Sequence, residues 1–197
     1  MRARLYRHTA DLLVGLRVLF IPASIILFNT EKPRWCITGM ILLITAALFD
    51  WMDGFIARRL RISSELGSLL DTLGDRITEN LLMLFFVYKQ LIPLPAGVIF
   101  LMRAFLADFV RTVNFKHGIG TFAVNRSRLG RILVASPFSR MSYLLLKMTL
   151  FLLCARALYI ESGDALIRAF SWLVVTAACV RFLALVYDSR EIFKQHY

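Results

Sequence analysis

The sequence contains six segments that are long and apolar enough to cross a membrane, and these segments constrain the fold most. They lie at 10–29, 35–58, 66–88, 93–114, 132–155 and 165–187. A membrane-spanning helix needs about 20 mainly apolar residues. Turn-forming or polar residues mark the connections at 29–33, 63–64, 92–95 and 161–164. We therefore expect an all-α protein, an integral membrane bundle of six transmembrane helices.

The composition supports a membrane protein. The chain has 197 residues, of which 58% are hydrophobic and 19% charged, whereas a soluble domain has about 45–50% apolar and about 25% charged residues. This length predicts one domain over 1–197, with short cytoplasmic N- and C-terminal segments. The net charge of +11 is typical of nucleic-acid binders, but in so apolar a chain we expect basic residues to face anionic lipid, and no nucleic-acid partner. The three cysteines form no metal-ligand or disulfide pattern.

The basic residues predict the orientation. One side of the predicted bundle collects most of them, and the other has only Lys32, Arg34, Lys89 and Arg156. Cytoplasmic loops carry the excess of Lys and Arg in membrane proteins. We therefore expect the chain in the cytoplasmic (inner) membrane, with both termini and the turn at 58–65 facing the cytoplasm.

Four aspartates flank that turn, two on each side. Asp50 and Asp53 are about 60° apart on one helix, and Asp71 and Asp75 are about 40° apart on the next. Ionised groups at membrane depth are costly and usually functional. Two helices that each present a carboxylate pair can form a metal site. The alternative is ion pairing of the aspartates with the nearby arginines, which are Arg58, Arg59, Arg61 and Arg76.

The stretch that contains these aspartates carries a longer motif. It reads Asp50-x2-Asp53-Gly54-x2-Ala57-Arg58-x8-Gly67-x3-Asp71-x3-Asp75. At every specified position it resembles the signature of the CDP-alcohol phosphatidyltransferase family. The resemblance implies an enzyme of phospholipid biosynthesis that transfers the phosphatidyl group of CDP-diacylglycerol to a small alcohol and releases CMP. It also implies a homodimer in the lipid bilayer.

The resemblance assigns roles to these residues. It implies two Mg²⁺ or Mn²⁺ ions on Asp50, Asp53, Asp71 and Asp75, with Asp75 also taking the proton of the acceptor hydroxyl. Hard divalent cations of this kind prefer carboxylate and phosphate oxygens. The small residues leave room for the cytidine, and the polar ones contact the diphosphate. The implied cytidine diphosphate site consists of Asp53, Gly54, Ala57, Arg58, Ser64 and Gly67.

Arginines in the later segments predict a site for the acceptor's phosphate. Arg103, Arg111 and Arg140 lie within or beside predicted spans, and arginine binds phosphate through paired N–H donors. Cytoplasmic topology and contact with lipid headgroups explain the loop arginines equally well.

The identity of the acceptor is ambiguous in the sequence. Arg17 and Pro22 resemble the first helix of phosphatidylglycerophosphate synthases. Arg76, directly after Asp75, is closer to the synthases that use inositol phosphate. Ser142 replaces a basic residue of the glycerophosphate enzymes. Glycerol 3-phosphate is the first choice and inositol phosphate, as in a phosphatidylinositol phosphate synthase, the second.

Two other classes are alternatives. A divalent-metal transporter would also carry membrane carboxylates, but it would usually show broken helices and an internal repeat, and no repeat is found. A structural membrane subunit would not need the small residues Gly54, Ala57 and Gly67.

Overall fold

The computed structural model describes residues 19–60, 65–116, 127, 130–160 and 164–196. Within these ranges the side chains of 50–60, 65–72, 115–116, 164 and 191–196 are outside the description. The described residues are almost entirely helical and contain no strand, which confirms the all-α prediction. The chain divides into two compact units, Met1–Tyr88 with Cys154–Ser162, and Lys89–Leu153 with Gly163–Tyr197. The single domain over 1–197 stays a prediction.

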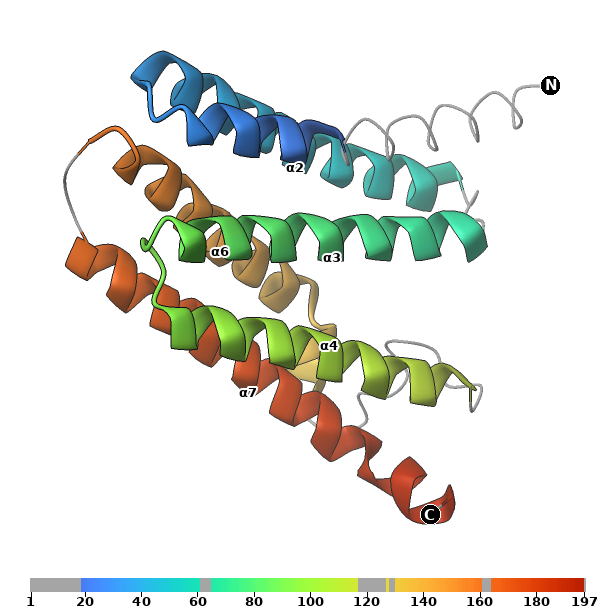
Figure 1. The fold of residues 1–197 in the computed structure, drawn as a ribbon. Helices are drawn as coiled ribbons and strands as arrows, with labels where there is room; N and C mark the ends of the chain where they lie inside the picture. The colour runs from blue at the N-terminus through green and yellow to red at the C-terminus, as the bar shows by residue number, and fades with distance from the viewer. Residues whose placement is uncertain (1–18, 61–64, 117–126, 128–129, 161–163, 197) are drawn as a thin grey trace. The chain divides into compact units, whose positions relative to one another are not determined.

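Helices occupy all the predicted segments, as far as these are described (Figure 1). They are Leu19–Asn29, α2 (Pro33–Leu60), α3 (Glu65–Tyr88), α4 (Leu94–Lys116), α6 (Pro137–Ala157) and α7 (Asp164–His196). A short π-helical turn, η1 (Arg131–Ala135), precedes α6. Within the described residues, two segments are long and apolar enough to cross a membrane by length and composition, Pro137–Ala157 and Ala165–Arg190. The other helices carry more charges or shorter apolar runs, so this criterion does not confirm six spans.

Phe28 is the centre of packing in the first unit. Its side chain is fully buried, and its ring lies 6.3 Å from that of Phe85 and 5.9 Å from that of Phe86, centroid to centroid. The helix Leu19–Asn29 thereby packs on α3. A Cβ on Gly39 of α2 would lie 2.7 Å from Phe28 Cε1. Gly39 is therefore the residue that lets α2 approach the same ring.

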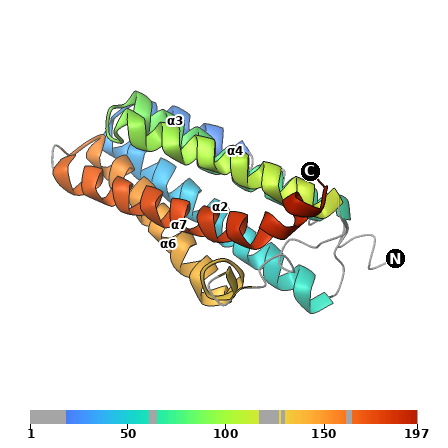
Figure 2. The ribbon, with the colours of Figure 1, turned by 90° about the horizontal axis from the view of Figure 1, so that it is seen from below.

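In the second unit α4 and α7 lie side by side (Figures 1 and 2). Their contact contains buried Ala107 and Val110 from α4 and Leu185 from α7. Apolar side chains at a spacing of three and four residues form one face of a helix, as Ala107 and Val110 do. This contact brings the polar residues of α4 and α7 near one another.

Pro137 determines where α6 begins. Proline lacks the backbone N–H that would donate to the carbonyl four residues earlier, but it fits the first position of a helix. The chain leaves the helical conformation at Ser136, which has φ −59° and ψ 132°. As a result the carbonyl of Leu133, four residues before Pro137, needs another donor.

Candidate functional site

The helix register places the two aspartate pairs at matching levels. Asp50 and Asp53 lie ten and seven residues before the end of α2, and Asp71 and Asp75 lie six and ten residues after the start of α3. At 1.5 Å per residue, Asp50 and Asp53 are about 15 and 10 Å from the end of α2. Asp71 and Asp75 are about 9 and 15 Å from the start of α3. Only residues 61–64 join those ends, which lie on the same side of the first unit (Figure 1). The backbone therefore puts Asp50 level with Asp75, and Asp53 level with Asp71.

The side chains of most predicted site residues lie outside the described residues. They are those of Asp50, Asp53, Gly54, Ala57, Arg58, Ser64, Gly67 and Asp71. Among the described residues no group of three His, Cys, Asp or Glu could hold a metal ion, but that part of the chain includes only Asp75 of the four aspartates. Four carboxylates at two matched levels are a donor set that suits hard divalent cations.

The described side chains at this end of the motif are those of Asp75, its last residue, and of the neighbours of Asp75 on α3. Asp75 is half-buried. Arg76 Nη1 lies 3.8 Å from Glu79 Oε2, one turn along the helix, and both side chains are less than one-fifth exposed. Arg76 therefore has an acidic partner outside the aspartate set. The side-chain oxygen of Asn80, Oδ1, is buried and has no hydrogen-bond donor in the described part of the chain.

The three arginines predicted for the acceptor's phosphate differ in burial and in their partners. Arg111 Nη1 lies 3.3 Å from Asp108 Oδ1, at a partly exposed position of α4. Arg103, eight residues earlier on the same helix, is only 8% exposed. Arg140 is exposed in the first turn of α6. Of the three, Arg103 alone is a buried cation.

Arg103 is held by Tyr143 of α6. Arg103 Nη2 donates a hydrogen bond of 2.8 Å to the phenol oxygen of Tyr143, and the guanidinium lies 5.3 Å from the centre of the Phe100 ring. Its Nε is buried and has no acceptor among the described residues. A buried polar group without a partner is costly. An unpaired donor on a buried cation is a place where an anion can bind.

Two further cations reach the same tyrosine, and neither is among the site residues predicted from the sequence. Lys147 Nζ lies 4.6 Å, and Arg181 Cζ 5.0 Å, from the centre of the Tyr143 ring. Lys147 is 6% exposed. Their signal in the sequence was a charge inside an apolar segment, the same signal that singled out Arg103.

Arg181 also fixes the chain before α6. Its Nη1 donates to the carbonyl oxygen of Leu133, and to the backbone and side-chain oxygens of Ser139. The Ser139 hydroxyl donates to the same Leu133 carbonyl at 2.6 Å. These two donors replace the N–H that Pro137 lacks. All hydrogen-bond acceptors of Arg181 are neutral oxygens, so no carboxylate among the described residues cancels its charge.

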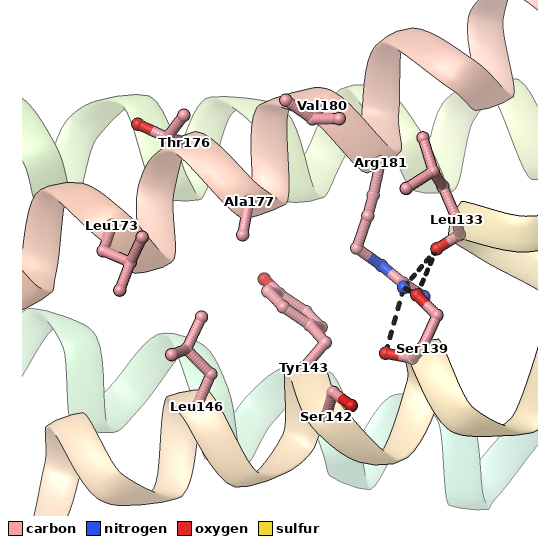
Figure 3. A pocket seen from close by; sticks show the side chains of 10 residues that line it. All are labelled: Leu133, Ser139, Ser142, Tyr143, Leu146, Leu173, Thr176, Ala177, Val180 and Arg181. Carbon is pink, nitrogen blue, oxygen red and sulfur yellow. Dashed lines mark hydrogen bonds between the residues drawn. The ribbon is translucent and has the colours of Figure 1, made fainter. Parts of the chain in front are cut away.

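A pocket of about 430 Å³ lies between α6 and α7 beside this cluster (Figure 3). Most of its wall is apolar, with Tyr143 in the middle and Arg181 toward one end. The lining residues are Leu133, Ser139, Ser142, Tyr143, Leu146, Leu173, Thr176, Ala177, Val180 and Arg181. Its volume is in the range of small-molecule sites.

A second polar cluster joins the end of α7 to the chain before η1. The backbone N–H of Ser127 donates to Asp188 Oδ1 at 3.3 Å, and the N–H of Gly130 donates to Ser127 Oγ at 2.9 Å. A Cβ on Gly130 would lie 1.9 Å from Asp188 Oδ2. Because Gly130 has an ordinary helical backbone, space and not backbone freedom requires glycine there.

Together these features define a class, a helical protein with membrane-type segments that carries two aspartate pairs on adjoining helices and a separate buried cation cluster. The comparisons with known proteins identify the family. The sequence model of the CDP-alcohol phosphatidyltransferases matches residues 7–181, and the chain belongs to this family.

Three similar proteins carry the same name, CDP-diacylglycerol–glycerol-3-phosphate 3-phosphatidyltransferase. The protein from Rickettsia bellii is 25% identical over 162 residues, which are 78% of this chain and 90% of the relative. The protein from Pseudomonas fluorescens is 31% identical over 52% of this chain and 57% of the relative. The protein from Bacillus subtilis is 31% identical over 56% of this chain and 55% of the relative. The match thus spans nearly all of the first relative and little more than half of the other two.

Proposed function

We propose that the chain is a membrane phosphatidyltransferase that transfers the phosphatidyl group of CDP-diacylglycerol to glycerol 3-phosphate and releases CMP. The observation that carries this proposal is the family match over residues 7–181, which includes the whole Asp50–Asp75 motif. The names of the three relatives support both substrates. Their shared acceptor favours glycerol 3-phosphate over inositol phosphate.

The four aspartates would hold two divalent cations, Mg²⁺ or Mn²⁺. Bound there, the ions would supply charge stabilisation to the pyrophosphate and to the attacking and leaving oxygens. The matched levels of Asp50 with Asp75 and of Asp53 with Asp71 support this assignment. Gly54, Ala57 and Gly67 would leave room for the cytidine.

The proposed reaction forms one bond and breaks one bond at phosphorus. The acceptor's hydroxyl oxygen bonds to the phosphorus of the phosphatidyl group, and the bond from that phosphorus to the oxygen shared with CMP breaks. Asp75 accepts the hydroxyl proton as a general base. Arg58 and Ser64 would orient the diphosphate so that the leaving oxygen faces away from the attacking one.

The acceptor's phosphate would bind at the second unit's cations. Arg103 supports this because its buried Nε has no acceptor among the described residues. Arg140 is one turn before Tyr143 on α6 and would reach the phosphate from the exposed side. Arg111 contributes less than the sequence predicted, since Asp108 is already 3.3 Å away.

The six-span topology also belongs to this proposal. Helices α2, α3, α4, α6 and α7 have 28, 24, 23, 21 and 33 residues. Each is therefore about 30 Å long or more, enough to cross the hydrocarbon core. With the first predicted segment they make six spans, with both termini cytoplasmic and with a homodimer as the assembly. Protease protection of a C-terminal tag in vesicles of known orientation tests the sidedness, and cross-linking in native membranes tests the dimer.

The decisive experiment measures CMP release by the purified protein with CDP-diacylglycerol and Mg²⁺ or Mn²⁺. The acceptors are glycerol 3-phosphate, inositol phosphate, inositol, serine and water alone. We expect release with glycerol 3-phosphate. Release with inositol phosphate alone would move the protein to the other subfamily, and metal uptake into vesicles without CDP-lipid would favour a transporter. Folded protein that neither turns over nor binds CMP would refute the function.

A further inference from the structure

Tyr143 is the point at which charged side chains from three helices meet. Arg103 comes from α4, Lys147 from α6 and Arg181 from α7. The guanidinium carbons and the ammonium nitrogen all lie within 6.0 Å of the centre of one phenol ring. Cations so close together repel one another strongly in a medium of low dielectric constant. The arrangement requires something that offsets the repulsion.

The phenol offsets part of the repulsion in two ways. Its oxygen accepts the hydrogen bond from Arg103 Nη2, and the ring attracts cations through its negative face. Lys147 is four residues after Tyr143, so the two side chains lie on one face of α6. Within the described part of the chain, Arg103 keeps a buried N–H without an acceptor and Arg181 donates only to neutral oxygens. A bound anion would offset the rest of the repulsion.

We propose that Tyr143 is the positioning residue of the site for the acceptor's phosphate. Its hydroxyl fixes the guanidinium of Arg103, and its ring fixes Lys147 and Arg181, so that their charges serve one phosphate group. This inference rests on the proposed function, because it names the substrate that the cluster holds. Tyr143 acts through the three cations and takes no part in the bond changes at phosphorus.

The first variant is Tyr143→Phe, which keeps the ring and removes the hydroxyl. Loss of one hydrogen bond to a charged group is expected to raise the KM for glycerol 3-phosphate about tenfold. The kcat and the KM for CDP-diacylglycerol should change less than twofold. Tyr143→Leu removes the ring as well and should raise the acceptor KM further, since the cation–π contacts are lost too.

The matched control is Tyr187→Phe. Tyr187 is an exposed tyrosine of the same unit, with Arg190 Cζ 4.1 Å from its ring centre. Like Tyr143, it has an arginine beside its ring, but its side chain is more than half exposed and its arginine is a different one. The control should leave both KM values and kcat unchanged.

Inorganic phosphate provides a readout that does not depend on turnover. Phosphate should raise the unfolding temperature of the wild-type protein and compete with glycerol 3-phosphate. For Tyr143→Phe the concentration needed for both effects should rise by the same factor as the acceptor KM, while sodium chloride at equal ionic strength has no effect in either protein.

The outcomes separate the two proposals. If the wild-type protein shows no acceptor-dependent CMP release, the proposed function is refuted. The rise in unfolding temperature with inorganic phosphate still tests the role of Tyr143 in that case. Active Tyr143→Phe with an unchanged acceptor KM and unchanged phosphate protection refutes the positioning role. A variant with lower kcat, higher KM for both substrates and a lower unfolding temperature would show that Tyr143 only supports the fold. That result would also refute the positioning role. If Tyr143→Leu does not fold, Tyr143→Phe decides the question.

Discussion

Asn114 of α4 donates a hydrogen bond from Nδ2 to the hydroxyl oxygen of Ser189 of α7, at 2.8 Å, and both side chains are buried. Ser189 in turn donates to the carbonyl of Leu185, also at 2.8 Å. The bond joins residues 75 positions apart. It fastens the cytoplasmic end predicted for α4 to the last turns of α7.

Removal of this bond should destabilise the second unit. Ser189→Ala leaves the Asn114 amide buried without its acceptor, which costs about 1–3 kcal/mol. Replacement of both partners, Asn114→Leu with Ser189→Ala, should cost less than the sum of the single changes. Chemical unfolding in detergent, run as a double-mutant cycle, measures the coupling. Additive losses would show that the bond contributes nothing of its own.

Gly130→Ala should destabilise the contact between α7 and the chain before η1. The added Cβ would clash with Asp188 Oδ2, and the carboxylate can move aside only by disturbing its hydrogen bond from the Ser127 N–H. Overpacking of this kind typically costs about 1–3 kcal/mol. The same change made together with Asp188→Ala should recover part of the loss, because the obstructing oxygen is gone. Thermal unfolding of the single and double variants measures this. A single variant as stable as wild type would contradict the steric argument.

Asp75→Asn should abolish turnover without loss of the nucleotide site. An amide cannot take the hydroxyl proton, and loss of a general base typically costs a factor of about 10²–10⁴. CMP binding in the presence of Mg²⁺, measured by calorimetry, should persist.

Asp108→Asn is the control for the aspartate change, since Asp108 is an aspartate of α4 that pairs with Arg111 and is not part of the aspartate motif. It should retain near wild-type activity. Full activity in Asp75→Asn would remove Asp75 as the base.

Arg103→Ala and Arg111→Ala should differ sharply, although the sequence predicted the same role for both. Arg103 is buried against Tyr143, and loss of hydrogen bonds from a charged group should raise the acceptor KM about 10- to 100-fold. Arg111 Nη1 lies 3.3 Å from Asp108 Oδ1, so Arg111→Ala should change the acceptor KM about twofold or less. Initial-rate kinetics with varied glycerol 3-phosphate distinguish the two. Equal effects would show that Arg111 binds the acceptor as well.

Local patterns in the sequence predicted the helices and the family. Apolar runs interrupted at Pro33, Pro93 and Pro95 located most helix ends within about five residues. The exception is the end of α7, which was predicted at 187 and lies at His196. The spacing of the aspartates and glycines over 26 positions identified the family, because the residues of this motif lie on adjoining helices and are therefore close in sequence. The roles of those aspartates stay predictions.

The cation cluster could not be predicted in the same way. Arg103 and Tyr143 are 40 residues apart, and Arg181 and Ser139 are 42 apart. No local pattern records which apolar faces meet, so a charge inside a span can be recognised but its partner cannot. Likewise Gly130 carries no signal in the sequence, because its requirement comes from Asp188 on another helix.

The length of α7 has a consequence for the lipid environment. With 33 residues the helix is about 50 Å long, whereas the hydrocarbon core is about 30 Å thick. Its last turns are fastened at Asp188 to Ser127 and at Ser189 to Asn114. A helix that meets a thicker or thinner bilayer responds by tilting. In the proposed topology α4, which is tied to α7 through Asn114, would follow that tilt. Bilayer thickness would then act directly on the helix that carries Arg103, a residue proposed to bind the acceptor.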